Sequence, residues 1–317
     1  MAFNPKDFIE ESISSLIKLD GTAILAASGG VDSTVCAVLA HKALGSRFKA
    51  VFVDTGVLRK GEVGQVKENF KQLGIALVTV DASKEFFAGL KGIVHPEKKR
   101  KKIGELFIKV FEHEAKELKA KYLIQGTIAP DWIESGSGIR DTIKTHHNVG
   151  GLPKKMGLKV VEPIRDLYKD EVRAIAKELK MQKDPEWRQP FPGPGLAVRV
   201  IGEVTREKAA LCREANAIVT EEIYSAFQLK EIDSLPWQYF AVLLDTKTTG
   251  VQGDVRAYGY TVAIRAIEST DAMTAQYFKI PHAILHRISL RITNGLKQIN
   301  RVVYDITDKP PATIEWL

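Results

Sequence analysis

Cysteine is scarce in this sequence, and its scarcity excludes several kinds of protein. Only Cys36 and Cys212 occur among the 317 residues, far apart and in no C-x-x-C pair. This argues against a disulfide framework, a zinc site and a dithiol redox motif. We therefore expect both cysteines to be packing residues.

Long apolar runs are also lacking. No window approaches the about 20 apolar residues that a membrane helix needs, and no basic segment followed by an apolar stretch opens the chain. Charged residues make up 27% and hydrophobic residues 44%, as in ordinary globular proteins. We expect a cytoplasmic globular protein that does not bind a membrane.

Acidic residues are outnumbered, 39 against 46 basic ones, which gives a formal charge of +7. A positive charge suits anionic ligands, and both nucleic acid and small phosphorylated metabolites fit. The densest basic run, residues 98–102, is typical of a helix face in contact with solvent, and we expect this for most of it.

Short apolar runs alternate with segments of helical apolar spacing in the first half of the chain. The runs end near Ala27, Asp54, Asp81 and Gln125. This alternation predicts an α/β fold, a parallel sheet with helices on both faces. A polar cluster follows each run, and we interpret the four clusters as one ligand-binding crevice at the carboxyl edge, although each could also be a structural cap.

Glycine and proline divide the rest of the chain. Residues 132–153 are rich in glycine and polar residues and predict a functional lid. The run RQPFPGPGLAVRV from Arg188 is too rich in proline and glycine to be helical and predicts a domain boundary, with domains 1–188 and 189–317. Strands at 239–244, 260–267 and 301–306 and helices near 205–227 and 282–298 predict a smaller α+β second domain.

The segment SGGVDS, residues 28–33, carries the clearest chemical signal. Its glycines let the backbone approach an anion, and amides at a following helix N-terminus would point toward that anion. Asp32 would repel a bare phosphate, so its presence makes sense if Mg²⁺ bridges the two. A helix merely capped by Ser or Asp is the alternative. The predicted nucleotide-binding residues are Ser28, Gly29, Gly30, Val31, Asp32, Ser33, Thr34, Val53 and Gly126.

The loop SGGVDS resembles that of the ATP pyrophosphatase superfamily, whose members cleave ATP between the α- and β-phosphates and transfer AMP. Neither G-x-x-x-x-G-K-[ST] nor G-x-G-x-x-G after the first strand is present, which weakens kinase and dehydrogenase interpretations. The loop alone does not distinguish amidating synthetases from RNA-thiolating enzymes.

Further stretches resemble the GMP synthetase family in the same order over nearly the whole chain. They are FVDTGVLRKGE, PEKKRKKIG, QGTIAPDWIES, IKTHHNVGGLP, VEPIRDLYKDEVR, RQPFPGPGLAVRV, GVQGD and RVVYDITDKPPATIEW. No glutamine amidotransferase domain precedes the loop, so the resemblance implies the separate ATP pyrophosphatase subunit of a two-subunit enzyme. It also implies an adenine nucleotide α-hydrolase-like fold followed by a dimerisation domain.

The resemblance implies a ligase that forms a C–N bond. The xanthine oxygen of XMP attacks the α-phosphate of ATP, Mg-pyrophosphate leaves, and ammonia displaces AMP from adenylyl-XMP to give GMP. ATP and Mg²⁺ are then required, ammonia comes from a separate glutamine amidotransferase subunit, the chain forms a homodimer, and no nucleic acid is bound.

The resemblance also assigns site residues. Lys144 is expected near the α-phosphate, assisted by His146 and His147, while Asp131, with Glu134, would bind Mg²⁺ or order the lid. The positions expected to hold XMP are Arg188, Gln252, Lys309, Thr313 and Glu315. The chain departs from the family in ending with Leu317 instead of glutamate and in the small residues of the lid segment SGSGIRD.

Two other functions remain open from the sequence. A tRNA-base adenylating thiolase would use the same loop, but sulfur transfer normally needs a reactive cysteine pair. A sensor or scaffold that binds ATP without turnover is the non-enzymatic alternative.

Overall fold

The computed structural model describes residues 3–130, 157–181, 189–252, 254–270 and 272–317. The chain groups into two compact units, which are described separately. Unit 1 comprises Met1–Asp54, Glu62–Ala82 and Gly104–Glu186, and unit 2 comprises Thr55–Gly61, Ser83–Ile103 and Trp187–Leu317. Two segments from the first half of the chain thus group with unit 2, and the division at residues 188 and 189 stays a prediction.

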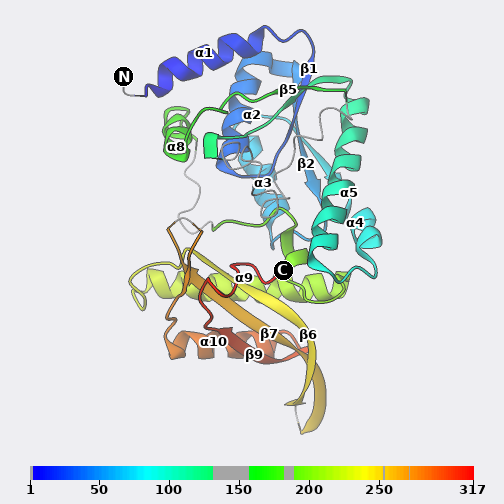
Figure 1. The fold of residues 1–317 in the computed structure, drawn as a ribbon, viewed down its shortest axis with the longest axis vertical. Coiled ribbons are helices and arrows are strands. Elements are labelled where there is room, and N and C mark those ends of the chain that lie inside the picture. Colours follow the sequence, from blue (N-terminus) through cyan, green and yellow to red (C-terminus); the bar gives the residue numbers. More distant parts are fainter. Residues whose placement is uncertain (1–2, 131–156, 182–188, 253, 271) are drawn as a thin grey trace. The chain divides into compact units, whose positions relative to one another are not determined.

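Unit 1 is built on a five-stranded sheet in the order β3-β2-β1-β4-β5. Figure 1 labels three of its strands, β1, β2 and β5. The strands are β1 (Thr22–Ala26), β2 (Phe48–Asp54), β3 (Leu77–Asp81), β4 (Ala120–Ile124) and β5 (Lys159–Val161). Every pairing is parallel. The predicted parallel sheet is confirmed; the short strand β5 was not predicted, because three residues carry too little periodicity.

Helices cover this sheet on both faces. They are α1 (Pro5–Ile17), α2 (Val31–Leu44), α3 (Glu62–Gln72), the second half of α5 (Pro96–Glu117) and α8 (Lys169–Glu178). Right-handed crossovers put α2 and α3 on one face and α5 on the other, because the strand order reverses after β3. Helix α2 is buried nearly all round and forms the centre of the core.

Unit 2 contains a mixed four-stranded sheet. Its strands are β6 (Gln238–Gln252), β7 (Val255–Glu268), β8 (Gln276–Tyr277) and β9 (Ile299–Asp305). β6 and β8 run antiparallel to β7, whereas β9 runs parallel to it. Helices α4 (Ser83–Leu90), α9 (Arg206–Gln228) and α10 (His282–Gly295) complete the unit. The predicted α+β character is confirmed.

Two expectations about helical segments need correction. The run that was judged too rich in proline and glycine to be helical contains one short 3-10 turn, η3 (Gly195–Val198). Helix α10 ends at Gly295, three residues before its predicted end, because the chain then turns into β9.

The basic run at residues 98–102 lies in helix α5 and is only partly a solvated face. Lys98 and Lys101 are exposed as expected, but Lys99 is completely buried. Its amino group donates hydrogen bonds to the carbonyls of Ala197, at 3.3 Å, and Val200, at 2.7 Å. Burial lowers the pKa of Lys99 to about 8. A solvated face was expected for most of the run, and Lys99 is the exception, since each helical position turns by about 100° and one residue of the run faces inward.

Within the described ranges, no helix is long and apolar enough to cross a membrane.

Candidate functional site

The carboxyl edge of the unit 1 sheet gathers the four predicted polar clusters. The end of β1 pairs with β2 and with β4, and Asp54 at the end of β2 lies beside Asp81 at the end of β3. The prediction that the clusters share one edge is confirmed. Because β1 stands between β2 and β4, the strand order reverses beside it, and ligands of open α/β sheets bind at such a point.

The segment after β1 folds into a tight loop held by its own hydroxyls. Gly29 has a φ of +75°, which a residue with a side chain rarely adopts. The hydroxyls of Ser28 and Ser33 lie 2.9 Å apart, and those of Ser33 and Thr34 donate to the carbonyl of Gly30, at 3.0 and 2.7 Å. These bonds fix the backbone of the loop.

Helix α2 begins directly from this loop. Its N-cap residue is Gly30, which has no side chain to cap the helix, and the amide of Gly30 donates to the Ser28 hydroxyl, at 3.3 Å. The first amides of a helix lack partners within the helix and carry the positive end of its dipole. The start of α2 is therefore suited to an anion such as a phosphate group.

Gly126, after β4, packs against this loop. A Cβ atom at Gly126 would lie 3.1 Å from both the carbonyl carbon of Asp32 and the amide nitrogen of Ser33. That approach is too close for an ordinary side chain without a shift of the loop backbone. The structure thus gives Gly126 a clear steric role beside the loop, while contact with a nucleotide stays a prediction.

Lys169 is a site residue that the sequence did not reveal. Its amino group donates to both carboxylate oxygens of Asp32, at 2.8 and 2.6 Å. Lys169 opens helix α8, 137 residues from Asp32 along the chain. No local pattern marks such a partner, because only the folded sheet brings the two segments together.

Asp32 offers one carboxylate for a magnesium ion. Within the described part of the chain, no group of three or more His, Cys, Asp or Glu side chains is arranged to hold a metal. Magnesium does not require one, since it commonly binds through one or two carboxylates, with phosphate oxygens and water as its other ligands. Asp32 beside an anion-binding loop fits a magnesium ion that arrives with a nucleotide.

Several predicted residues are not tested by the structure. Asp131, Glu134, Lys144, His146, His147 and Arg188 lie outside the described residues. Gln252 ends β6, where its backbone pairs with Val255. Val53 is buried in β2, with 4% of its surface exposed. Their proposed contacts with ATP or XMP stay predictions.

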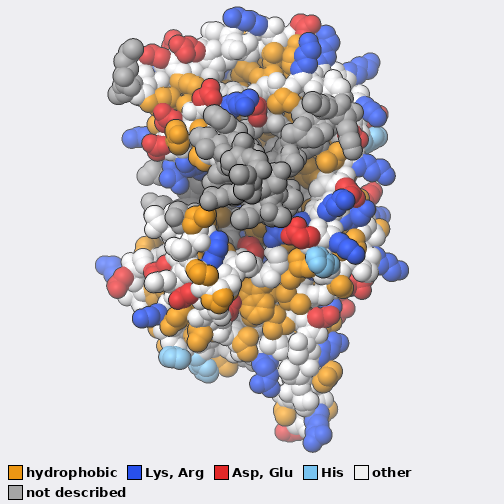
Figure 2. All heavy atoms as spheres, in the orientation of Figure 1, with side chains coloured by type: hydrophobic (Ala, Val, Ile, Leu, Met, Phe, Trp, Pro, Cys, Tyr) orange, Lys and Arg blue, Asp and Glu red, His pale blue; other side chains and the backbone are white. Residues whose placement is uncertain are grey.

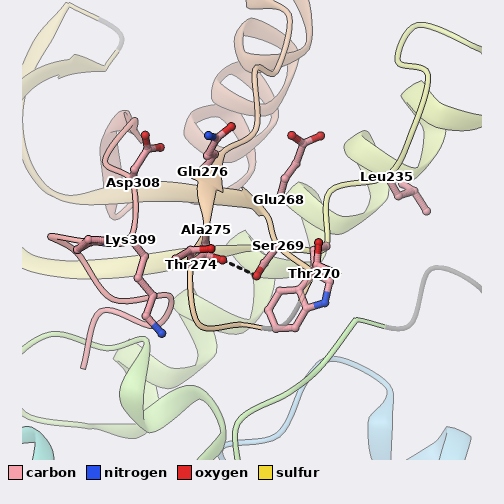
Figure 3. Close-up of a pocket in the computed structure, with 11 residues that line it drawn as sticks. Leu235, Glu268, Ser269, Thr270, Thr274, Ala275, Gln276, Asp308 and Lys309 are labelled. Atoms are coloured by element: carbon pink, nitrogen blue, oxygen red, sulfur yellow. Dashed lines mark hydrogen bonds between the residues drawn. The ribbon is translucent and has the colours of Figure 1, made fainter. Parts of the chain in front are cut away.

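A pocket of about 680 Å³ in unit 2 includes Lys309. Glu268 and Ser269 border it, with Thr274 from the adjoining loop and Asp308 beside Lys309 (Figure 3). The Lys309 amino group donates to the carbonyl of Ala272, at 2.7 Å, and its backbone pairs with that of Ala275. The pocket therefore combines a cation with hydroxyl and carboxylate groups.

The C-terminal segment is held in place by three arginines. Arg265 donates to the carbonyls of Thr307 and Thr313, Arg100 donates to the carbonyl of Leu317, and Arg199 binds the carboxylate of Glu315. Trp316 adds a bond to Asp305, at 3.0 Å. These contacts argue against a frayed tail and bring Lys309, Thr313 and Glu315 into one folded segment.

Both cysteines are packing residues. Cys36 and Cys212 are fully buried. Burial raises the pKa of Cys36 well above its usual range and that of Cys212 to about 12, so both stay protonated thiols at neutral pH. The buried thiols offer no nucleophile for sulfur transfer.

The fold and the loop define the class of this protein. It is an α/β protein of the adenine nucleotide α-hydrolase type, with a glycine-containing loop between its central strand and helix α2, and with a second α+β unit. The family model "NAD synthase" matches residues 4–107, and "GMP synthase C terminal domain" matches residues 225–316.

Curated relatives narrow this class to one family. The chain is 58% identical to the B subunit of glutamine-hydrolyzing GMP synthase from Thermococcus kodakarensis over 98% of this chain and 99% of the relative. It is 58% identical to the protein of the same name from Pyrococcus furiosus (98% and 96% covered) and 57% to that from Thermoplasma acidophilum (98% and 97%). The chain belongs to the family of GMP synthase B subunits.

Proposed function

We propose that this protein catalyses the ATP-dependent amination of XMP to GMP. The observation that carries the proposal is the loop SGGVDS with a helix that starts at its Gly30 N-cap, at the reversal point of a parallel sheet, in a chain whose relatives are named as GMP synthase B subunits. The xanthine oxygen of XMP attacks the α-phosphorus of ATP, pyrophosphate leaves, and ammonia then displaces AMP from the adenylyl-XMP intermediate. Both steps are transfers between bound reactants, so positioning and charge stabilisation supply the catalysis.

The loop residues 28–34 act on the departing pyrophosphate. Amides at the start of α2 donate to its oxygens and stabilise the charge that develops as it leaves. Asp32 would hold a magnesium ion, which when bound neutralises phosphate charge. Lys169, by contacting both oxygens of Asp32, keeps that carboxylate at the loop and adds positive charge nearby.

Unit 2 is proposed to bind the acceptor, XMP. The Lys309 ammonium suits the 5′-phosphate of XMP, and its place in a pocket of about 680 Å³ supports this role. Thr313 and Glu315 are proposed to contact the rest of the nucleotide, together with Gln252 and Arg188. Lys144, His146 and His147 remain proposed to act at the α-phosphate, and Asp131 as a second metal residue.

The proposal includes partners and a location. Each of the relatives is named as one subunit of GMP synthase, which supports a separate partner subunit, and we propose that this partner is a glutamine amidotransferase that delivers ammonia. We also propose a homodimer, acting in the cytoplasm. Nucleic acid is not proposed as a ligand: on the face that Figure 2 shows, lysines and arginines are interspersed with acidic side chains.

Pyrophosphate release tests the function. The purified chain is incubated with ATP, Mg²⁺ and ammonium, with and without XMP, and with tRNA in place of XMP. XMP-dependent release together with GMP formation supports the synthetase. Release that depends on tRNA would instead identify a base-adenylating thiolase, and no release with either acceptor would indicate an ATP-binding sensor.

A further inference from the structure

Glu315 is already bound by three donors within unit 2. Its Oε1 atom accepts from Arg199 Nη2, at 2.7 Å, and from Gln238 Nε2, at 3.0 Å, while its Oε2 atom accepts from Arg199 Nε, at 3.0 Å. A carboxylate offers about four lone-pair positions, two on each oxygen. One acceptor position, on Oε2, is left by these three bonds.

Arg199 is itself held rigidly. Its side chain is 1% exposed, and its guanidinium carbon lies 4.0 Å from the ring centre of Phe240 and 5.2 Å from that of Phe191. Nη1 donates to the side-chain oxygen of Asn216, at 3.3 Å. The two phenylalanine rings and Asn216 fix the plane of the Arg199 guanidinium. Because this guanidinium binds both oxygens of Glu315, it also fixes the plane of the Glu315 carboxylate.

The charge of the pair matters as much as its geometry. Glu315 is 14% exposed, and its carboxylate pairs with the guanidinium of Arg199. The guanidinium cancels most of the field of the carboxylate. A neutralised carboxylate with one open lone pair favours a neutral N–H or O–H donor over a cation.

We propose that Arg199 is a positioning residue for acceptor recognition: it pairs with Glu315 and orients it so that Oε2 accepts one hydrogen bond from a ring N–H or a ribose hydroxyl of the nucleotide. This inference rests on the proposed function, since it takes XMP as the acceptor. Arg199 does not touch the acceptor. It acts through Glu315 alone.

The test compares Arg199→Met, Glu315→Gln and the double variant in the pyrophosphate assay. We expect Arg199→Met to raise the KM for XMP at least about tenfold, the size of one lost charge-assisted hydrogen bond, with a much smaller change in the KM for ATP.

The double variant keeps the test valid if Arg199→Met alone fails to fold, because it replaces a buried ion pair by uncharged groups, a change that proteins often tolerate. Its KM for XMP should not exceed that of Glu315→Gln. Arg287→Met is the matched control, since it breaks an arginine–carboxylate pair between α9 and α10 and should leave the KM for XMP unchanged.

Two results would overturn the inference: equal increases in both KM values for Arg199→Met, or a double variant that binds XMP more weakly than Glu315→Gln. A wild-type chain without XMP-dependent pyrophosphate release would refute the proposed function itself, and this inference with it.

Discussion

Gly126 shows how one missing methyl group shapes the nucleotide loop. A Cβ there would lie 3.1 Å from backbone atoms of Asp32 and Ser33. We expect Gly126→Ala to displace the loop, weaken ATP binding measured by calorimetry, and cost about 1–3 kcal/mol of unfolding free energy. Gly104→Ala is the control, since nothing lies within 4 Å of its Cβ position in helix α5 and the change should stabilise the helix slightly. Normal ATP affinity in Gly126→Ala would contradict this role.

Lys99 should give unit 2 an unusual dependence of stability on pH. Its pKa is lowered from 10.5 to about 8 in the folded state, so the unfolded state binds more protons between these values. Stability from this group therefore rises with pH across that window and is constant below it. We expect the unfolding free energy of wild type minus that of Lys99→Met to increase from about pH 7.5 to about pH 10. The exposed Lys101→Met variant should show no such trend; a flat difference for Lys99→Met would refute the prediction.

The sequence predicted the nucleotide loop better than it predicted the basic residues that pair with distant carboxylates. The glycines, hydroxyls and aspartate of SGGVDS stand together in the sequence, and their geometry follows from local rules. Lys169 and Arg199 could not be found in this way. Each acquires its meaning from a carboxylate more than a hundred residues away, Asp32 for Lys169 and Glu315 for Arg199. Such pairs depend on tertiary packing, which local spacing does not encode.

Among the elements of unit 2, we expect the C-terminal segment to be the one whose deletion lowers stability and XMP binding most. Deleting residues 308–317 removes the Thr313 carbonyl from Arg265 and removes Glu315 from Arg199, which leaves the buried guanidinium of Arg199 without its carboxylate partner. We expect a loss of about 3–5 kcal/mol in the stability of unit 2 and a loss of XMP binding. Hydrogen exchange measured by mass spectrometry should show faster exchange in β7 and β9.

Exchange in β1 and β2 serves as the internal control for that deletion, because these strands belong to unit 1 and should keep their protection. A truncated chain with unchanged exchange in β9 and unchanged XMP affinity would show that the segment is dispensable.

The elements were largely predictable because their periodicity is strong. Strands β1 to β4 are apolar runs ended by polar residues, and α2 and α9 have long apolar patterns. Burial could not be predicted from the sequence where it depends on tertiary neighbours. Lys99 lies in a run of basic residues, yet it is buried, and its amino group donates to two carbonyls of a proline-rich turn. Likewise, no pattern in residues 55–61 or 83–103 indicates that they group with unit 2.

At the scale of the whole molecule, the source of nitrogen is the feature to test. If a partner subunit supplies ammonia, the purified chain should form GMP with ammonium and form none with glutamine. GMP production is followed by chromatography, and ammonium added to the glutamine reaction is the control that the enzyme is competent. Glutamine-dependent GMP formation by this chain alone would contradict a separate amidotransferase.

The counter-charges of unit 2 also have a consequence for synthesis in the cell. Arg199 and Arg265 are buried, yet their carboxylate partners Glu315 and Asp305 are translated more than a hundred and about forty residues later, respectively. Until those carboxylates leave the ribosome, the nascent unit must keep both guanidinium groups hydrated. We therefore expect unit 1 to be able to assemble on the ribosome, and unit 2 to close its core only after Glu315 has emerged.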